Sequence, residues 1–250
     1  MRVRQTHVDS GGAERQLRPP WLPDACVEHS GPRVWLARWG RCMEADWLDW
    51  AMRLQAVAQN GLTFATNPFD TERYQSVSQI AAEMLAAGSG TSVRQVVDLF
   101  SSEVGYATPK IDVRGVVFDD DALLFVRERM DHNHWTLPGG WADVGETPSQ
   151  GVEREVLEES GYHAGAIKVL AIYDRRKQGH VPDIPHHVYK VFFLCQLRGG
   201  AATKSVETDG AAFFRQSEVP ADLSLSRVTS AQVARMFEHR RHPEWPTDFD

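Results

Sequence analysis

Three glutamates in the middle of the chain have a spacing that could bind a divalent metal ion. Glu155, Glu158 and Glu159 occupy positions i, i+3 and i+4. On a helix, their carboxylates would share one face within a single turn. Carboxylates this close repel one another by about a few kcal/mol unless a cation lies among them. Hard oxygen ligands favour Mg²⁺ or Mn²⁺ over zinc, and Mg²⁺ commonly bridges carboxylates to substrate phosphates.

The residues on either side predict that this segment is a helix from about Pro148 to Ser160. Thr147 is a suitable N-cap, and Gln150 stands where a capping box requires it. Proline suits the first helical position, and Gly161 can adopt the left-handed conformation that ends a helix. The helix would therefore hold the three carboxylates in register.

The alternative is a solvated, glutamate-rich surface helix in which Arg154 and Glu158 form a simple i,i+4 pair. The longer pattern favours the metal site. It reads G-x5-E-x7-R-E-U-x-E-E-x-G-U, where U is aliphatic or aromatic. The matching residues are Gly140, Glu146, Arg154, Glu155, Val156, Glu158, Glu159, Gly161 and Tyr162. This stretch resembles the signature of the Nudix hydrolases, and the resemblance covers roughly residues 108 to 225.

The resemblance implies an enzyme that cuts the pyrophosphate of a nucleoside diphosphate linked to another group, X. It implies that the three glutamates are catalytic metal ligands for Mg²⁺ or Mn²⁺, and that Arg154 orients a neighbouring glutamate by a salt bridge. Glu146 corresponds to the supporting acid. Gly139 and Gly140 let the loop backbone come close, and the Gly140 carbonyl is a further candidate ligand.

The chemistry agrees with this assignment. A pyrophosphate repels a nucleophile, and a bound metal ion both neutralises that charge and lowers the pKa of coordinated water. A glutamate of the cluster or of a nearby loop then removes the proton. Glu207 is the loop candidate, with an ordinary loop carboxylate as the alternative.

Several flanking residues could contact the substrate. Residues 110 to 128 are predicted to form two strands joined by an Asp-rich turn. Arg114 is a charge in an apolar strand, so it needs either a phosphate ligand or a partner such as Asp112. Arg127, at the end of the second strand, is equally ambiguous.

Aromatic and basic residues provide further candidates. Trp135 and Trp141 could stack on a base, although an aromatic near a strand end is more often part of the core. Cations and histidines surround the loop before the apolar strand Val188 to Leu194, and they could hold phosphates. These are Arg175, Lys177, His180, His186 and His187, of which His180 is a candidate substrate contact. The histidines lack a zinc-ligand spacing with cysteines.

Composition bounds the class of protein. The chain has 250 residues, 42 % of them hydrophobic, and a net charge of −7, which argues against broad nucleic-acid binding. Its three cysteines are scattered, which disfavours a disulfide framework and favours a reducing cytoplasm. No apolar run is long enough for a membrane span.

The chain divides into three predicted regions. Residues 1–42 are rich in arginine and aperiodic, so we expect a disordered or loosely packed leader. Residues 43–107 are predicted to form a helical domain, with one helix closed by Gly61, a second capped by Asp70 and ending at Gly88, and a third capped by Ser92. Residues 108–250 form the third region, with a late helix after Ser230 and a frayed tail over residues 238–250.

The helical region adds a second resemblance. The stretch RLQAVAQNGLTFATNPFDTERY resembles the N-terminal extension of a Nudix subgroup that includes CDP-choline and ADP-ribose pyrophosphatases. The resemblance implies a homodimer and an α/β/α sandwich with a mixed sheet, preceded by a small all-α domain. We therefore predict an enzyme acting on ADP-ribose or CDP-choline. The alternatives are a non-catalytic sensor of ADP-ribose-type nucleotides and a hydrolase of RNA ends.

Overall fold

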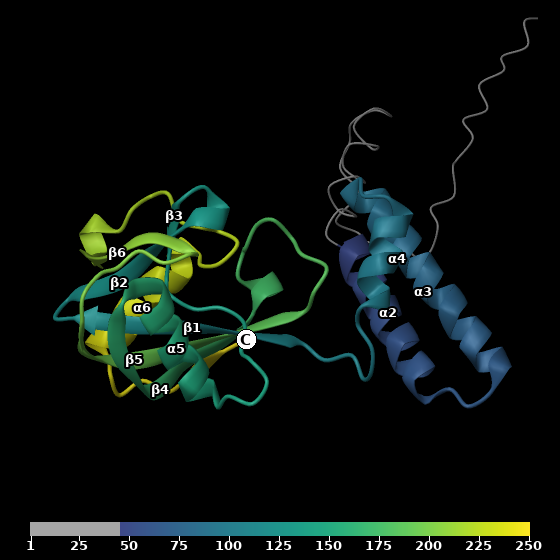
Figure 1. Cartoon of the computed structure of the whole chain (residues 1–250), viewed down its shortest axis with the longest axis horizontal. Helices are drawn as coiled ribbons and strands as arrows, with labels where there is room; N and C mark the ends of the chain where they lie inside the picture. The colour runs from purple at the N-terminus through teal and green to yellow at the C-terminus, as the bar shows by residue number, and fades with distance from the viewer. Residues whose placement is uncertain (1–45) are drawn as a thin grey trace, which may run out of the picture. The chain divides into compact units, whose positions relative to one another are not determined.

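The computed structural model describes residues 46–250. The predicted leader over residues 1–42 and the predicted helix start at Met43 lie outside that part. Three helices come first in it: α2 (Asp46–Phe64), α3 (Pro68–Ser89) and α4 (Val93–Ser101) (Figure 1). They share a small core of Ala51, Ala82, Leu85, Ala86 and Val96. No helix between residues 46 and 250 combines the length and the apolarity that a membrane span requires.

Two glycines that were expected to end helices lie inside them instead. Gly61 falls within α2 and Gly88 within α3, which ends at Gly90 in the left-handed conformation. A Cβ at Gly61 would overlap the ring of Tyr74, and a Cβ at Gly88 would overlap the ring of Trp47. Both glycines therefore allow close side-chain packing, which is a tertiary requirement rather than a local stop signal.

The caps of the next two helices differ in how well they were predicted. Asp70 does not cap α3, because Asn67 takes that position and accepts the Asp70 N–H at 2.8 Å. Pro68 directly follows the cap and suits the first helical position, so the helix begins earlier than expected. Ser92 caps α4 as predicted, with Gln95 completing a capping box.

A mixed sheet of seven strands forms the centre of the remaining chain. Its order is β3-β2-β1-β5-β4-β7, and β6 pairs with β2. β1 runs parallel to β5, whereas β4 runs antiparallel to β5. The strands are β1 (Lys110–Asp119), β2 (Ala122–Glu128), β3 (His134–Thr136), β4 (Tyr162–Asp174), β5 (Val188–Gly200), β6 (Thr208–Arg215) and β7 (Asp248–Phe249).

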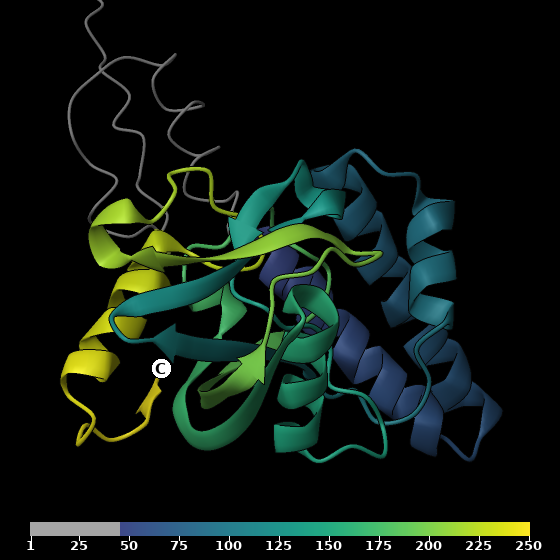
Figure 2. The ribbon, with the colours of Figure 1, turned by 60° about the vertical axis from the view of Figure 1, so that its left-hand side comes forward.

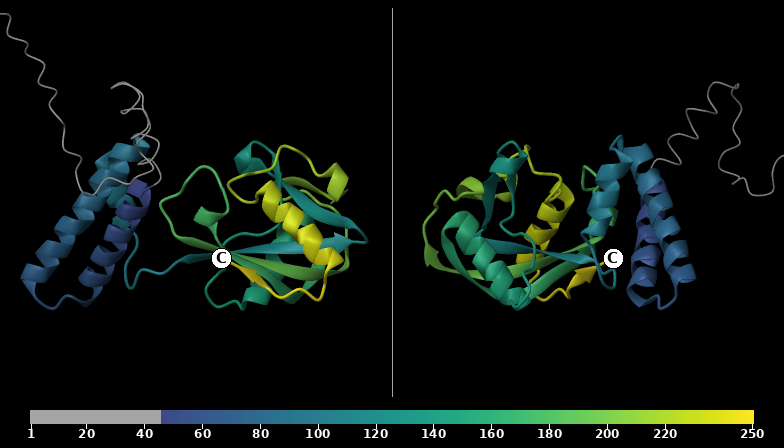
Figure 3. Two further views of the ribbon diagram at one scale, coloured as in Figure 1. Left: turned by 180° about the vertical axis from the view of Figure 1, so that it is seen from behind. Right: turned by 45° about the vertical axis from the view of Figure 1, so that its right-hand side comes forward.

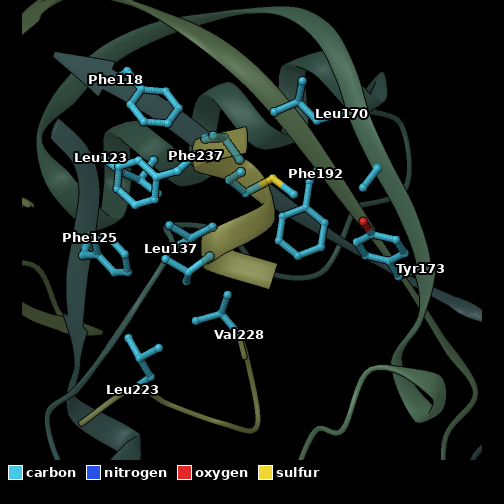
Figure 4. Packing of buried hydrophobic residues seen from close by; sticks show 14 residues of the cluster. Phe118, Leu123, Phe125, Leu137, Leu170, Tyr173, Phe192, Leu223, Val228 and Phe237 are labelled. Atoms are coloured by element: carbon cyan, nitrogen blue, oxygen red, sulfur yellow. The ribbon is translucent and has the colours of Figure 1, made fainter. Parts of the chain in front are cut away.

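Two helices cover opposite faces of this sheet (Figure 2, Figure 3). α5 (Pro148–Ser160) packs Val152 and Val156 on one face. α6 (Ser230–Arg241) packs on the other face. There the Phe237 ring meets the Phe118 ring edge-on, with the ring centroids 5.5 Å apart (Figure 4). The alternation of β1 side chains between these two cores is what a strand buried on both faces requires. The predicted sandwich, preceded by a helical region, is confirmed.

Residues 238–250 were expected to fray, and that prediction is wrong. α6 continues to Arg241, and β7 adds to the edge of the sheet beside β4. Asp248 accepts hydrogen bonds from Arg235 Nη2 at 2.9 Å and Tyr173 OH at 3.1 Å, and lies 3.0 Å from His239 Nε2. These partners lie on α6 and β4, so the local charge and proline content did not reveal them.

Candidate active site

The helix that carries the three glutamates has the predicted bounds and caps. The Thr147 side chain accepts the Gln150 N–H, and the Gln150 side chain accepts the Thr147 N–H. Gly161 ends the helix at φ 80°. α5 then presents Glu155 and Glu159 to the interior, whereas the side chain of Glu158 is 60 % exposed.

Glu159 is held by the loop that precedes α5. Its Oε2 accepts the Gly139 N–H at 2.8 Å. Gly139 has φ 143°, and a Cβ there would overlap the Val113 carbonyl, so only glycine lets the loop lie this close to β1. Burial raises the pKa of Glu159 to about 8, although Arg114 and the Gly139 N–H oppose that rise. The positive charge around Glu159 is therefore too small to offset the cost of burying its carboxylate.

Glu155 is also buried and lines the same cavity as Glu159, but it is bonded to Arg154. Burial raises its pKa, and the neighbouring Arg154 only partly offsets that effect. A Cβ at Gly140 would come 2.9 Å from Glu155 Oε1, so a side chain at this position would crowd the carboxylate. The Gly140 carbonyl accepts the Val113 N–H at 2.8 Å and keeps a second lone pair.

Arg154 is bound to several of the acids of this region. Its Nε donates to Glu146 Oε1 at 3.0 Å, and its Nη1 donates to both Glu155 Oε1 and Glu158 Oε2 at 3.0 Å. These contacts, that with Glu146 above all, raise the pKa of the guanidinium. In this structure, the positive charge between the carboxylates of Glu155 and Glu158 is therefore the guanidinium of Arg154.

The three glutamates do not yet converge as metal ligands. Across residues 46–250, no three His, Cys, Asp or Glu side chains form a group that could hold a metal ion. Within the predicted triad, the Glu158 side chain is exposed and bonded to Arg154, whereas Glu155 and Glu159 are buried. The donor set still suits a hard divalent cation, because Glu155 and Glu159 are two buried carboxylates with raised pKa values.

These carboxylates face a cavity of about 500 Å³. Its wall carries acidic and basic groups. The lining residues are Asp112, Arg114, Gly139, Gly140, Trp141, Asp143, Arg154, Glu155, Glu159, Arg175, Ile184, Val188, Lys190, Glu207, Ser226 and Arg227. A volume of this size is typical of a small-molecule site.

The same cavity wall also holds a buried ion-pair cluster. Arg114 donates to Asp112 through Nε at 2.8 Å and Nη2 at 2.7 Å, and Lys190 Nζ donates to Asp112 Oδ1 at 2.9 Å. Burial alone would raise the pKa of Asp112, but the two cations hold it well below its usual range. Asp112 is therefore the partner of Arg114, and the guanidinium still borders the cavity.

Sequence reasoning missed Lys190, Ser226 and Arg227. Lys190 carried a usable signal, because it is a charge within the apolar strand Val188 to Leu194, just as Arg114 is within β1. Ser226 and Arg227 lie in an irregular segment before α6, and no local pattern distinguishes them.

The other predicted site residues differ in whether they line the cavity. Glu207 is exposed and borders the cavity, and its role as a proton acceptor stays a prediction. The Trp135 and Phe214 rings meet edge-on with their centroids 4.9 Å apart, and the Arg127 guanidinium carbon lies 5.4 Å from the centroid of the Trp135 ring. Neither Trp135 nor Arg127 lines the cavity. His180 is buried behind the wall, its Nδ1 2.9 Å from the Leu225 carbonyl, and burial lowers its pKa to about 4.

Comparisons with known proteins agree with this architecture. Residues 45–100 match a UDP-X-like N-terminal oligomerisation domain, and residues 108–233 match the NUDIX domain. YjhB of Bacillus subtilis, whose name provisionally assigns it as an ADP-ribose pyrophosphatase, is 40 % identical over 208 residues. That match covers 83 % of this chain and 99 % of the relative.

Two solved structures extend the comparison. An ADP-ribose pyrophosphatase from Streptococcus suis is 39 % identical with a TM-score of 0.52, and the match covers 57 % of this chain and all of that one. A UDP-X diphosphatase is 29 % identical with a TM-score of 0.52, over 83 % of this chain and 99 % of its own. Together with the α5 signature and its cavity, these matches show that the chain belongs to the Nudix hydrolase family of enzymes.

Proposed function

We propose that the protein is a Mg²⁺-dependent hydrolase of a nucleoside diphosphate linked to X, with ADP-ribose as the favoured substrate and CDP-choline as the next. The cavity carries this proposal, because one wall combines the buried pair Glu155 and Glu159 with the basic groups Arg114 and Lys190. A pyrophosphate needs both, a site for its metal ion and positive charge for its oxygens. The similarity to proteins named ADP-ribose pyrophosphatases supports the choice of substrate.

The metal ion would be held by Glu155, Glu158 and Glu159, with the Gly140 carbonyl as a further ligand. When bound, it supplies Lewis-acid chemistry and lowers the pKa of a coordinated water. Arg154 keeps the first two carboxylates positioned through its hydrogen bonds.

The reaction is attack of water on one phosphorus of the pyrophosphate. The bond from that phosphorus to the bridging oxygen breaks, giving a nucleoside monophosphate and a phosphorylated X. Glu207 borders the cavity, which supports our proposal that it accepts the proton that the water loses. We further propose that the enzyme acts in the cytoplasm as a homodimer, a state supported by the match of its N-terminal helices to an oligomerisation domain.

A substrate panel tests this proposal. ADP-ribose, CDP-choline and a UDP-linked sugar are incubated with the protein and Mg²⁺, and released nucleoside monophosphate is quantified by chromatography. We expect release from ADP-ribose that stops when Mg²⁺ is omitted. Nucleotide binding without any release would favour a sensor, and shortening of labelled RNA ends alone would favour the RNA hydrolase.

A further inference from the structure

Arg175 is a buried cation with an unused donor. It opens the turn after β4, its side chain is almost fully buried, and it lines the cavity of the glutamates. Nη2 donates to the Pro182 carbonyl at 2.7 Å. Nη1 is buried and has no hydrogen-bond partner among the described residues. Leaving a charged donor unpaired in the interior costs free energy that a ligand could recover.

The neighbouring acids do not supply the missing partner. Asp112 already accepts both hydrogen bonds from Arg114 and one from Lys190. Asp183, which also attracts Arg175, is exposed to water. Arg114 and Lys190 are therefore both hydrogen-bonded to a carboxylate, whereas among the described residues the Arg175 guanidinium is hydrogen-bonded only to a backbone carbonyl.

We propose that Arg175, together with Lys190, forms an anion subsite that receives the phosphoryl group farther from Glu155 and Glu159. The inference rests on the proposed function, because it assigns the second phosphate of the same diphosphate. Arg114 connects the two groups, since it is hydrogen-bonded to Asp112, its charge also interacts with Glu159 and Glu155, and it lines the same cavity as Arg175. A guanidinium with a free N–H matches a phosphate oxygen in charge and geometry.

The test uses inorganic pyrophosphate with the full-length protein in the presence of a chelator, so that only the basic groups can attract the ligand. Binding is measured by calorimetry for the wild type, Arg175→Gln, Arg175→Lys and the control Arg240→Gln. Arg240 is an exposed residue of α6 that does not line the cavity. We expect Arg175→Gln to weaken binding at least about tenfold, Arg175→Lys to retain part of it, and Arg240→Gln to match the wild type. Equal binding by wild type and Arg175→Gln would overturn the subsite.

Stability separates this role from a purely structural one. Arg175→Gln loses the hydrogen bond from Nη2 to the Pro182 carbonyl but also removes the buried Nη1, which lacks a partner within residues 46–250, so it should unfold at a denaturant concentration close to that of the wild type. A clear loss of stability in both Arg175→Gln and Arg175→Lys, alongside the loss of binding, would assign Arg175 to the fold and refute the proposal. With an active substrate, Arg175→Gln should raise KM about tenfold and change kcat far less. Pyrophosphate binding needs no turnover, so an inactive protein that still shows the Arg175-dependent binding would refute the proposed function while keeping the subsite.

Discussion

At the scale of single residues, Arg154 organises the acids of α5. One guanidinium joins Glu146, Glu155 and Glu158, each at 3.0 Å. Glu159 lies outside this set and depends on the Gly139 N–H and the charge of Arg114. The three glutamates that share one spacing in the sequence therefore differ in their surroundings, and Glu159 is the one most in need of an added cation.

Replacing Glu159 should abolish most of the activity and leave the fold intact. Glu159→Gln removes a carboxyl group whose charged form burial already disfavours, and an amide oxygen can still accept the Gly139 N–H. We expect turnover of the best substrate to fall by about 100-fold or more at saturating Mg²⁺. Circular dichroism and denaturant unfolding check the fold, and Glu72→Gln on the exposed surface of α3 is the control. Turnover near the wild-type rate would contradict the assignment.

The sequence predicted the reactive residues better than it predicted their partners. The spacing of Glu155, Glu158 and Glu159 is local, so it can be read directly from the chain. The choice between Asp112 and a phosphate for Arg114 could not be made in that way. It was settled partly by Lys190, which is 78 residues away from Asp112 and arrives beside it because β5 pairs with β1.

At the scale of elements, helices with complete local signals were predictable and close contacts were not. α5 has a capping box, a proline and a C-terminal glycine within its own sequence, and its bounds are the predicted ones. Gly61 and Gly88 gave the same apparent stop signal but lie where the Tyr74 and Trp47 rings approach. The pairing of β7 with β4 was likewise invisible, since it joins segments more than 70 residues apart.

Asp248 should connect the stability of the C-terminal element to pH. Its hydrogen bonds with Arg235, and then those with His239 and Tyr173, lower its pKa to about 2. A carboxyl group whose pKa is lowered by folding stabilises the protein above pH 4, and that contribution disappears as the pH falls from about 4 to about 2. We expect Asp248→Asn to lower the free energy of unfolding by up to about 2 kcal/mol at pH 7.

Denaturant titrations at pH 7 and at pH 2 measure this difference. The gap between wild type and Asp248→Asn should narrow at the lower pH, because about half of the wild-type carboxyl is then protonated in the folded protein and most of the stabilisation is lost. Asp222→Asn, at an exposed position outside these contacts, serves as the control. A gap that stays constant between the two pH values would show that the Asp248 charge contributes nothing.

At the scale of the whole molecule, the helical region exposes apolar side chains that a second copy could cover. Val57 of α2 is 57 % exposed and Ile80 of α3 is 49 % exposed. This region matches an oligomerisation domain, whereas the substrate cavity is lined by residues from position 112 onward. Assembly and chemistry are therefore assigned to different parts of the chain, although the proposed domain boundaries at residues 42 and 107 stay predictions.

Light scattering coupled to size-exclusion chromatography tests the expected dimer. The wild type should have twice the chain mass of 28.1 kDa. Placing charges on the apolar helices through Val57→Glu and Ile80→Glu should shift the protein toward the mass of one chain, because buried charges disfavour an interface. Met130→Glu, at an apolar side chain that is 86 % exposed and lies outside these helices, should leave the mass unchanged. A wild type with the mass of one chain would refute the dimer.

The contacts of Arg154 also bear on how the protein behaves when Mg²⁺ is scarce. Part of the acidic charge of α5 is already compensated by an internal counter-ion, so folding does not have to wait for the metal. At the metal site we propose, loading would then be an exchange, in which a dication would take the place of some guanidinium contacts of Glu155 and Glu158. Such an exchange would make metal uptake weaker than filling an uncompensated acidic site. It would leave the protein folded during a shortage of divalent ions and ready to bind them when they return.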